Sequence, residues 1–318
     1  MGRTFGERWE VLTDAVRMPG DRLLWCAGTD NGHRRPVVPP HRMDNPMTTS
    51  LSPDLVSLRD KQQKVWSSGD YNRIAALTVP VNEATVVAAS VIPGERVLDV
   101  ATGTGHSALA AARQGGDVTA IDYVPALLDI ARGRAAAEHL DVDFVEAPAE
   151  VLPFGNAAFD TGISSIGIMF AADHEQAARE LTRVVRPGGR IVVTSWTADG
   201  FVGGMLAAVG RHVTPPPGAR PATRWGDQHY VASLFGDRVH SVDSHTAGLT
   251  VRFVDAAAFA DLFLGYYGPT FAAASKLDED GKHALRADLI SLAESRQQPV
   301  PGGISIDWEY RVVEAVRS

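Results

Sequence analysis

Short apolar segments alternate with helical patterns through the middle of the chain. The runs at 97–100 and 118–121 are rich in Val, Leu and Ile, as strands buried on both faces are. An alanine-rich helical pattern follows the first run, and a longer helical pattern follows the second. Such alternation predicts a parallel sheet covered by helices on both faces, with right-handed crossovers. We expect strands at 97–100, 117–122, 143–146, 159–165 and 190–195, and helices at 105–114 and 124–139.

The flanking parts of the chain follow looser patterns. Ser52-Pro53-Asp54 is typical of a helix start and predicts a helix that runs to Trp66. Ile304, Ile306 and Trp308 alternate with polar neighbours, which predicts an antiparallel strand near the edge of the sheet. Between these ends we expect helices at 82–90, 201–212, 256–266 and 278–297, a helical piece that ends at Phe235, and strands at 248–254 and 304–313.

Residues 1–46 show no sustained period and carry many arginines and prolines. They offer few apolar side chains to offset the entropy of ordering, so we expect a flexible leader that adds little to the fold. An alternative is that translation begins at Met43 or Met47. We therefore expect a leader at 1–46, a helical N-terminal segment at 47–90 and the main domain at 91–318.

One motif concentrates the chemistry, Val97-Leu-Asp-Val-Ala-Thr-Gly-Thr-Gly105. It joins a buried strand to a carboxylate, Asp99, and to a turn in which Gly103 and Gly105 allow close backbone approach to a ligand. A second strand ends in another acid, Asp122, seventeen residues beyond Gly105. This plan is typical of nucleoside binding at the carboxyl edge of a parallel sheet.

The motif resembles the first motif of class I S-adenosylmethionine-dependent methyltransferases, in particular the branch of ubiquinone/menaquinone-biosynthesis C-methyltransferases. Ile121-Asp122-Tyr123, Ala149–Phe154 and Glu180–Gly189 resemble later motifs of that family and occur in the family's order. The resemblance covers about residues 60–200 most strongly. It implies a Rossmann-like, seven-stranded, mostly parallel α/β sheet whose last strand is antiparallel. It also implies that segment 47–90 is a helical lid and that about 197–300 shapes the acceptor pocket.

The resemblance implies S-adenosylmethionine as the cofactor and assigns its binding residues. Asp122 would bind the ribose hydroxyls, and Asp99 suits the positive amino group of the ligand. Two positions depart from the pattern: Ala101 stands where many relatives have glycine, and Pro148 stands where relatives often have an acid for the adenine. Glu150, a backbone carbonyl, or the Ala149 amide with packing would then hold adenine. The full set of expected cofactor residues is Asp99, Ala101, Gly103, Thr104, Gly105, Asp122, Tyr123, Ala149, Glu150 and Ser165.

Two other functions stay open at this point. Gly103–Ala108 also fits the G-x-G-x-x-G/A dinucleotide fingerprint, so a nicotinamide-dependent oxidoreductase is the alternative enzyme. Asp99 argues against it, because an acid beside the glycine turn would repel a diphosphate. The third possibility is a non-catalytic module that binds S-adenosylmethionine.

The sequence gives little indication of catalytic residues, because methyl transfer from a sulfonium needs mainly alignment. A general base would help an acidic acceptor, and His174 and His229 are the candidates. The alternative for His174 is a place in a helix N-terminus, and for His229 a surface or packing role. Tyr266 and Tyr267 either line the acceptor pocket or belong to the core, and Trp66 and Tyr71 either cover the cofactor or anchor a helix.

Composition limits the partners. The chain of 318 residues is 45% hydrophobic and has a formal net charge of −8. The negative charge and the absence of a long basic run argue against nucleic acid, so we expect a small-molecule methyl acceptor. The single cysteine, Cys26, excludes an internal disulfide and a cysteine-based metal site, and we expect no metal. No stretch is long enough to insert stably in a bilayer, and we expect a cytoplasmic protein. The acceptor, the methylated atom and the oligomeric state stay open.

Overall fold

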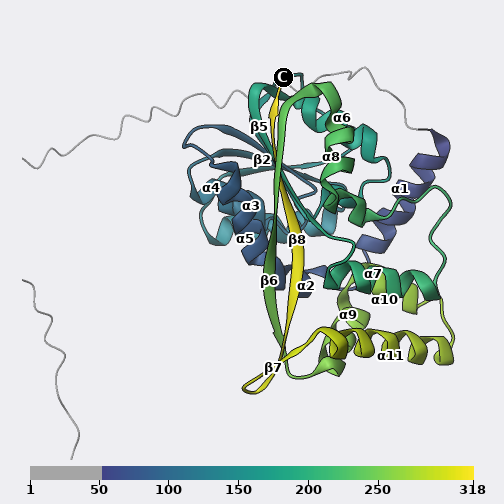
Figure 1. Cartoon of the computed structure of the whole chain (residues 1–318). Helices are drawn as coiled ribbons and strands as arrows, with labels where there is room; N and C mark the ends of the chain where they lie inside the picture. Colours follow the sequence, from purple (N-terminus) through teal and green to yellow (C-terminus); the bar gives the residue numbers. More distant parts are fainter. Residues whose placement is uncertain (1–51) are drawn as a thin grey trace, which may run out of the picture. The chain divides into compact units, whose positions relative to one another are not determined.

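The computed structural model describes residues 52–318, so the expected leader and its two alternative start methionines lie outside the described residues. The described chain forms an eight-stranded sheet in the order β3-β2-β1-β4-β5-β8-β6, with the short β7 paired to β8 (Figure 1). The first five strands pair in parallel and β8 is antiparallel to both neighbours. The strands are β1 (Arg96–Val100), β2 (Asp117–Asp122), β3 (Val142–Glu146), β4 (Phe159–Ser165), β5 (Val185–Trp196), β6 (Val239–Phe253), β7 (Gln298–Val300) and β8 (Gly303–Arg317).

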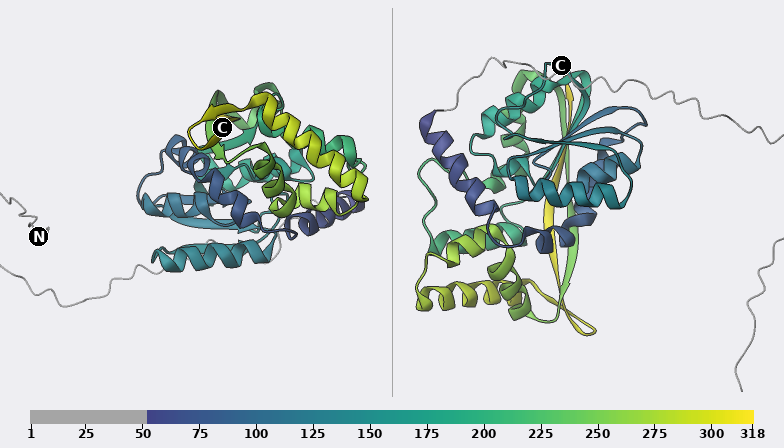
Figure 2. Two further views of the ribbon diagram at one scale, coloured as in Figure 1. Left: turned by 90° about the horizontal axis from the view of Figure 1, so that it is seen from below. Right: turned by 180° about the vertical axis from the view of Figure 1, so that it is seen from behind.

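Helices cover both faces of the sheet, as its continuous apolar strands require. α3, α4 and α5 lie together on one side, and α6 and α8 lie on the other (Figures 1 and 2). α7, α9 and α11 pack on one another and on the long β6–β8 pair. The helices are α1 (Pro53–Trp66), α2 (Tyr71–Ala75), α3 (Val79–Ala89), α4 (His106–Arg113), α5 (Pro125–Ala137), α6 (His174–Val184), α7 (Phe201–His212), α8 (Gln228–Phe235), α9 (Ala256–Tyr266), α10 (Gly268–Ala274) and α11 (Glu279–Arg296). Short 3₁₀ turns lie at Ala76–Thr78, Ile168–Phe170, Ala222–Gly226 and Gly236–Arg238.

The expected Rossmann-like α/β fold is confirmed, including an antiparallel strand near the edge of the sheet. This strand, β8, lies between β5 and β6, one place from the edge. Its first half has one buried face, but Val312, Val313 and Ala315 are all buried, as in a central strand. β6 begins at Val239 rather than 248, because this outermost strand exposes a polar first half that shows no apolar alternation. β7 raises the expected seven strands to eight.

Three helices, α1 to α3, precede the first strand of the described chain. α1 begins as expected, with the Ser52 hydroxyl accepting a hydrogen bond from the Leu55 amide at 3.4 Å. α2 was not expected, and α3 starts three residues earlier than the sequence indicated. Among residues 52–318, no helix is long and apolar enough to cross a bilayer.

Candidate functional site

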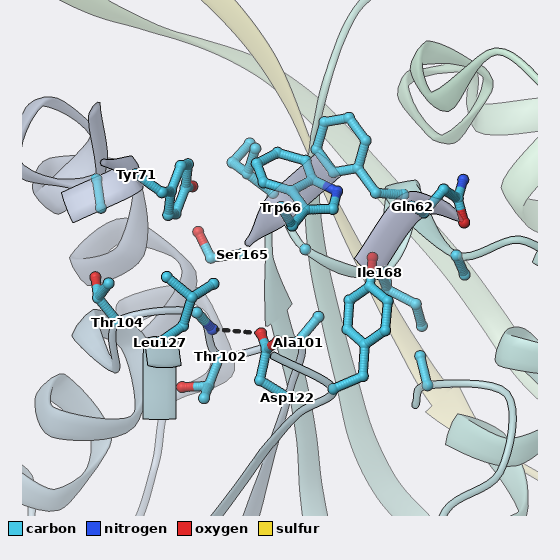
Figure 3. A pocket seen from close by; sticks show the side chains of 18 of the residues that line it. Gln62, Trp66, Tyr71, Ala101, Thr102, Thr104, Asp122, Leu127, Ser165 and Ile168 are labelled. Atoms are coloured by element: carbon cyan, nitrogen blue, oxygen red, sulfur yellow. Dashed lines mark hydrogen bonds between the residues drawn. The ribbon is translucent and has the colours of Figure 1, made fainter. Parts of the chain in front are cut away.

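The loop between β1 and α4 is tied to the end of β2. The amide of Gly103 donates to one carboxylate oxygen of Asp122 at 2.8 Å, and the Val124 amide donates to the other at 2.9 Å (Figure 3). The loop needs left-handed backbone at three positions, with φ of 55° at Ala101, 55° at Gly103 and 88° at Gly105. Asp122 thus fixes the shape of the glycine turn while its buried carboxylate remains part of the cavity wall.

The two glycines of the motif have different structural roles. A side chain at Gly103 would meet the ring of Tyr71 at 3.5 Å, an ordinary contact at the cavity wall. A side chain at Gly105 would lie 2.8 Å from the Cβ atom of Ala131 in α5. Gly105 therefore lets α4 start close against α5, and it does not line the cavity.

The loop after β4 lies directly against the β1 loop. A side chain at Gly167 would come within 2.5 Å of the Ala101 carbonyl oxygen, so only glycine fits there. The Ser164 hydroxyl donates to the Val100 carbonyl at 2.7 Å and accepts from the Ile168 amide at 2.9 Å. Ile166 has a φ of 55°, an unusual conformation for a β-branched residue. This turn directs the following residues into the cavity wall.

A cavity opens where these loops meet, at the carboxyl ends of β1, β2 and β4. Its empty space, counted together with the open solvent at its mouth, is about 820 Å³. α1 covers one side through Arg59, Gln62 and Trp66 (Figure 3). The expected cofactor residues that line it are Ala101, Gly103, Thr104, Asp122, Tyr123, Ala149, Glu150 and Ser165.

Asp99 lies beneath the wall rather than in it. One of its carboxylate oxygens accepts a 2.5 Å hydrogen bond from the Thr102 hydroxyl, and Thr102 lines the cavity. The other oxygen, Oδ1, has no hydrogen-bond partner in the described residues, although the nearby Ala108 amide offsets part of its charge. Burial, with the charge of Asp122 added, raises the pKa of Asp99 to about 7. Burial also raises the pKa of Asp122 to about 6, against the opposing effect of its amide hydrogen bonds.

Glu150 is buried and already partnered on one side. Its Oε1 accepts from the amides of Ala172 at 2.6 Å and Asp173 at 3.3 Å, so it anchors the loop that leads into α6. Burial raises the pKa of this carboxyl. Pro148 does not line the cavity, whereas both of its neighbours in the chain, Ala147 and Ala149, do.

The comparisons with known proteins agree with this geometry. A family model described as a methyltransferase domain matches residues 98–193. An uncharacterized protein of Mycobacterium tuberculosis (strain ATCC 25618 / H37Rv) is 41% identical over 263 residues, covering 81% of this chain and 95% of that protein. Demethylmenaquinone methyltransferase of Deinococcus radiodurans is 35% identical over 166 residues, covering 50% of this chain and 69% of that enzyme.

The chain belongs to the class I S-adenosylmethionine-dependent methyltransferases, in the ubiquinone/menaquinone branch. The crystal structure of the YcgJ protein from Bacillus subtilis has the same fold, with a TM-score of 0.53, 18% identity, and coverage of 74% of this chain and 97% of that chain. The cofactor of this methyltransferase is S-adenosylmethionine.

One orphaned polar atom in the cavity wall of the methyltransferase fits such a ligand. The buried hydroxyl of Thr104 has no partner among the described residues, and Thr104 lines the cavity. Unpaired buried polar atoms are costly and call for a ligand or water. This hydroxyl and the Asp122 carboxylate suit the polar groups of S-adenosylmethionine.

The structure brings neither candidate histidine of the methyltransferase to the cavity. His174 is buried, its Nδ1 lies 2.9 Å from the Tyr230 hydroxyl, and its ring packs on Trp225. Burial, reinforced by the charge of Arg220, lowers the pKa of His174 to about 4. The side chain of His229 is 99% exposed beside Asp227. His174 therefore has a packing role, and His229 lies on the surface.

Several wall residues escaped the sequence analysis. Gln62 and Arg59 come from α1, and Ile168 and Phe170 follow the strained turn after β4. Gly167 carries the signal that could have found this second loop, since a glycine directly after a buried strand often marks close backbone approach. Nothing in the pattern of α1 distinguishes its cavity-facing residues from ordinary amphipathic ones.

Proposed function

We propose that this methyltransferase binds S-adenosylmethionine in the cavity at the ends of β1, β2 and β4 and transfers its methyl group to a small-molecule acceptor. One observation carries the proposal: eight of the ten residues expected to bind the cofactor line a single cavity, around a buried acid at the end of β2.

The chain's own residues would hold the ligand as follows. Asp122 accepts hydrogen bonds from the ribose hydroxyls, and Thr104 supplies a hydroxyl partner at the glycine turn. Asp99 and Thr102 act as a pair, because Thr102 lies between the carboxylate and the cavity. Ala149 and Glu150 border the region expected to receive adenine. Bound S-adenosylmethionine supplies a methyl group that its sulfonium already activates, so the protein contributes mainly alignment and exclusion of water.

We further propose that the N-terminal segment acts as the lid, the role expected for 47–90. Trp66 and Tyr71 both line the cavity, and their rings meet edge to face with centroids 5.3 Å apart. The side chain of Gln63 donates to the Tyr123 carbonyl and so fastens α1 to the end of β2. Closing this segment over a ligand would exclude water from the reacting atoms.

Calorimetric titration with S-adenosylmethionine, S-adenosylhomocysteine and NADH tests the proposal. We expect micromolar binding of the first two, weakened about 10- to 100-fold by Asp122→Asn, since hydrogen bonds to a charged group contribute about 1.5–3 kcal/mol. Asp117→Asn is the matched control, because Asp117 is the exposed acid at the other end of the same strand. Thermal unfolding checks that both variants fold.

Other outcomes would refute the proposal. Binding of NADH alone would assign the cavity to a nicotinamide cofactor and support the oxidoreductase alternative. Binding of S-adenosylmethionine without turnover on any class of acceptor would favour the non-catalytic module. The Deinococcus relative is named for demethylmenaquinone, but that match spans half of this chain and does not assign the acceptor.

A further inference from the structure

The segment that covers the cavity, residues 63–75, packs against helices from the other end of the chain. Trp66 ends α1 and Tyr71 begins α2, and both rings line the cavity (Figure 3). Among residues 52–318, none after Ala172 lines that cavity. Yet α1 packs on α10, and α2 packs on α9. The helices α9 and α10 therefore adjoin the cover segment without reaching the space that it covers.

The backbones of the two segments meet with no side chain between them. The Asp70 amide donates a hydrogen bond to the Tyr266 carbonyl at 3.1 Å. Gly69 has a φ of 73°, and a Cβ atom there would lie 2.5 Å from the same carbonyl oxygen. A Cβ atom at Gly268 would lie 2.5 Å from the Val65 carbonyl oxygen. This close approach thus requires glycine on each of the two segments.

Aromatic rings fill the rest of the contact. The Tyr267 ring is buried and lies edge to face with Trp66, with centroids 5.6 Å apart, and tilted against Tyr71, with centroids 6.5 Å apart. The Arg73 guanidinium lies over the Tyr266 ring, 4.4 Å from its centroid. Neither tyrosine of this pair lines the cofactor cavity. Both instead contact the cover segment, and Tyr267 contacts the two rings that line the cavity.

The cover segment is joined to the sheet half of the protein by long side chains. The Gln63 amide donates to the Tyr123 carbonyl, and the Arg134 guanidinium of α5 donates to the side-chain oxygen of Asn72. Long side chains can follow a small shift of the backbone by changing rotamer. A backbone contact at glycine has no rotamer to change. The position of the cover segment is therefore set mainly by the turn between α9 and α10.

We propose that the turn between α9 and α10 positions the cover of the cofactor cavity, and that cofactor binding is felt through this turn by the C-terminal helices. Tyr266, Tyr267 and Gly268 act as positioning residues, since they hold Trp66 and Tyr71 in place and do not line the cavity. The inference rests on the proposed function, because it takes the cavity to bind S-adenosylmethionine beneath residues 63–75.

Hydrogen exchange of the full-length wild-type protein tests the transmission through the turn. Exchange is followed by mass spectrometry with and without saturating S-adenosylhomocysteine. We expect slower exchange at 63–75, which covers the ligand, and also at 266–275, which does not line the cavity. Ligand binding slows global unfolding in every segment by mass action, so residues 239–247 of β6 are the control. The slowing at 266–275 should exceed that at 239–247 by at least about threefold.

Glycine variants with matched controls separate positioning from folding. Gly268→Ala and Gly69→Ala should each raise the Kd for S-adenosylhomocysteine about five- to tenfold, because a displaced cover lowers the fraction of binding-competent protein. Gly265→Ala in α9 is the control for the first, and Gly94→Ala, also at positive φ, is the control for the second. An added Cβ atom at either control position meets nothing within 4 Å, so the Kd should stay unchanged.

Thermal unfolding of each variant fixes a temperature at which it is folded, and the Kd is measured there. A purely structural role would lower the melting temperature of Gly268→Ala and Gly69→Ala and leave the Kd of the folded protein equal to that of the controls. That result would overturn the inference.

The outcomes distinguish this inference from the function on which it rests. Failure of wild type to bind S-adenosylhomocysteine would overturn both. Binding that slows exchange at 63–75 but slows 266–275 no more than 239–247 would overturn the positioning role of the turn and leave the proposed cofactor in place. Binding that leaves exchange at 63–75 unchanged would refute the positioning role together with the lid.

Discussion

Replacing Asp99 by asparagine should destabilise the ligand-free methyltransferase at low pH and stabilise it at high pH. Asp99 is 1% exposed, and one of its carboxylate oxygens lacks a partner among the described residues. Burial raises its pKa from 3.8 to about 7. The folded state therefore holds the Asp99 proton up to about pH 7, whereas the unfolded chain releases it near pH 4.

The sign follows from this difference. Between these pH values the folded state binds more protons than the unfolded state, so the free energy of unfolding falls as the pH rises. A pKa shift of about three units corresponds to a loss of about 4 kcal/mol in the free energy of unfolding. This loss is absent below the pKa of the unfolded state and complete above the pKa of the folded state. Asparagine carries no charge but adds a buried N–H group that needs a partner, at a cost of about 1–3 kcal/mol.

These two contributions predict that the difference in stability between Asp99→Asn and wild type changes sign with pH. Near pH 4 the Asp99→Asn variant should be about 1–3 kcal/mol less stable than wild type, and near pH 8 about 1–3 kcal/mol more stable. Urea unfolding without ligand, followed across this range, measures the difference. Asp122 is buried in both proteins, so the effect of its own burial cancels in the difference, which reports Asp99 together with its interaction with Asp122. Asp117→Asn should track wild type. If the free energy of unfolding changed with pH in the same way for wild type and Asp99→Asn, the raised pKa of Asp99 would be refuted.

Two further predictions concern packing. Gly105→Ala and Gly94→Ala both place alanine at positive φ, but only the first brings a Cβ atom to 2.8 Å from Ala131. Urea unfolding should therefore show that Gly105→Ala is less stable than Gly94→Ala by about 1–3 kcal/mol. Equal losses of stability would contradict this. His174→Gln should leave kcat unchanged. Because burial lowers the pKa of His174, the variant should also flatten the rise in the free energy of unfolding between about pH 4 and pH 6.5. A large loss of kcat would restore His174 as a catalytic candidate.

The sequence predicted those parts of the fold in which one physical signal dominates. β2, α7 and α9 were located at their observed bounds, because each is an apolar stretch of the length and period expected for its type. The first half of β6 was missed, since an outermost strand with little burial needs no apolar alternation. The antiparallel β8 near the edge of the sheet was predicted from the alternation at Ile304, Ile306 and Trp308 and from the family resemblance.

The same contrast holds for the candidate site. Asp122 and Gly103 were identified from local spacing, and the structure places them in one hydrogen bond. The separate packing role of Gly105 depends on Ala131, 26 positions along the chain, and so could not be read from the motif. Which residues of α1 line the cavity depends on how that helix packs on the rest of the protein, and this cannot be read from the helix sequence alone.

The distribution of strain suggests which side of the cavity admits ligands. Ala101 and Ile166 both hold positive φ, each at a cost of about 1–3 kcal/mol, and the loops that contain them touch at Gly167. Such strain persists only where the surroundings fix it, here through the Asp122–Gly103 and Ser164 hydrogen bonds. These loops form a rigid floor. α1, in contrast, is fastened to the end of β2 by a single side-chain hydrogen bond from Gln63, so opening for the cofactor is expected on the α1 side.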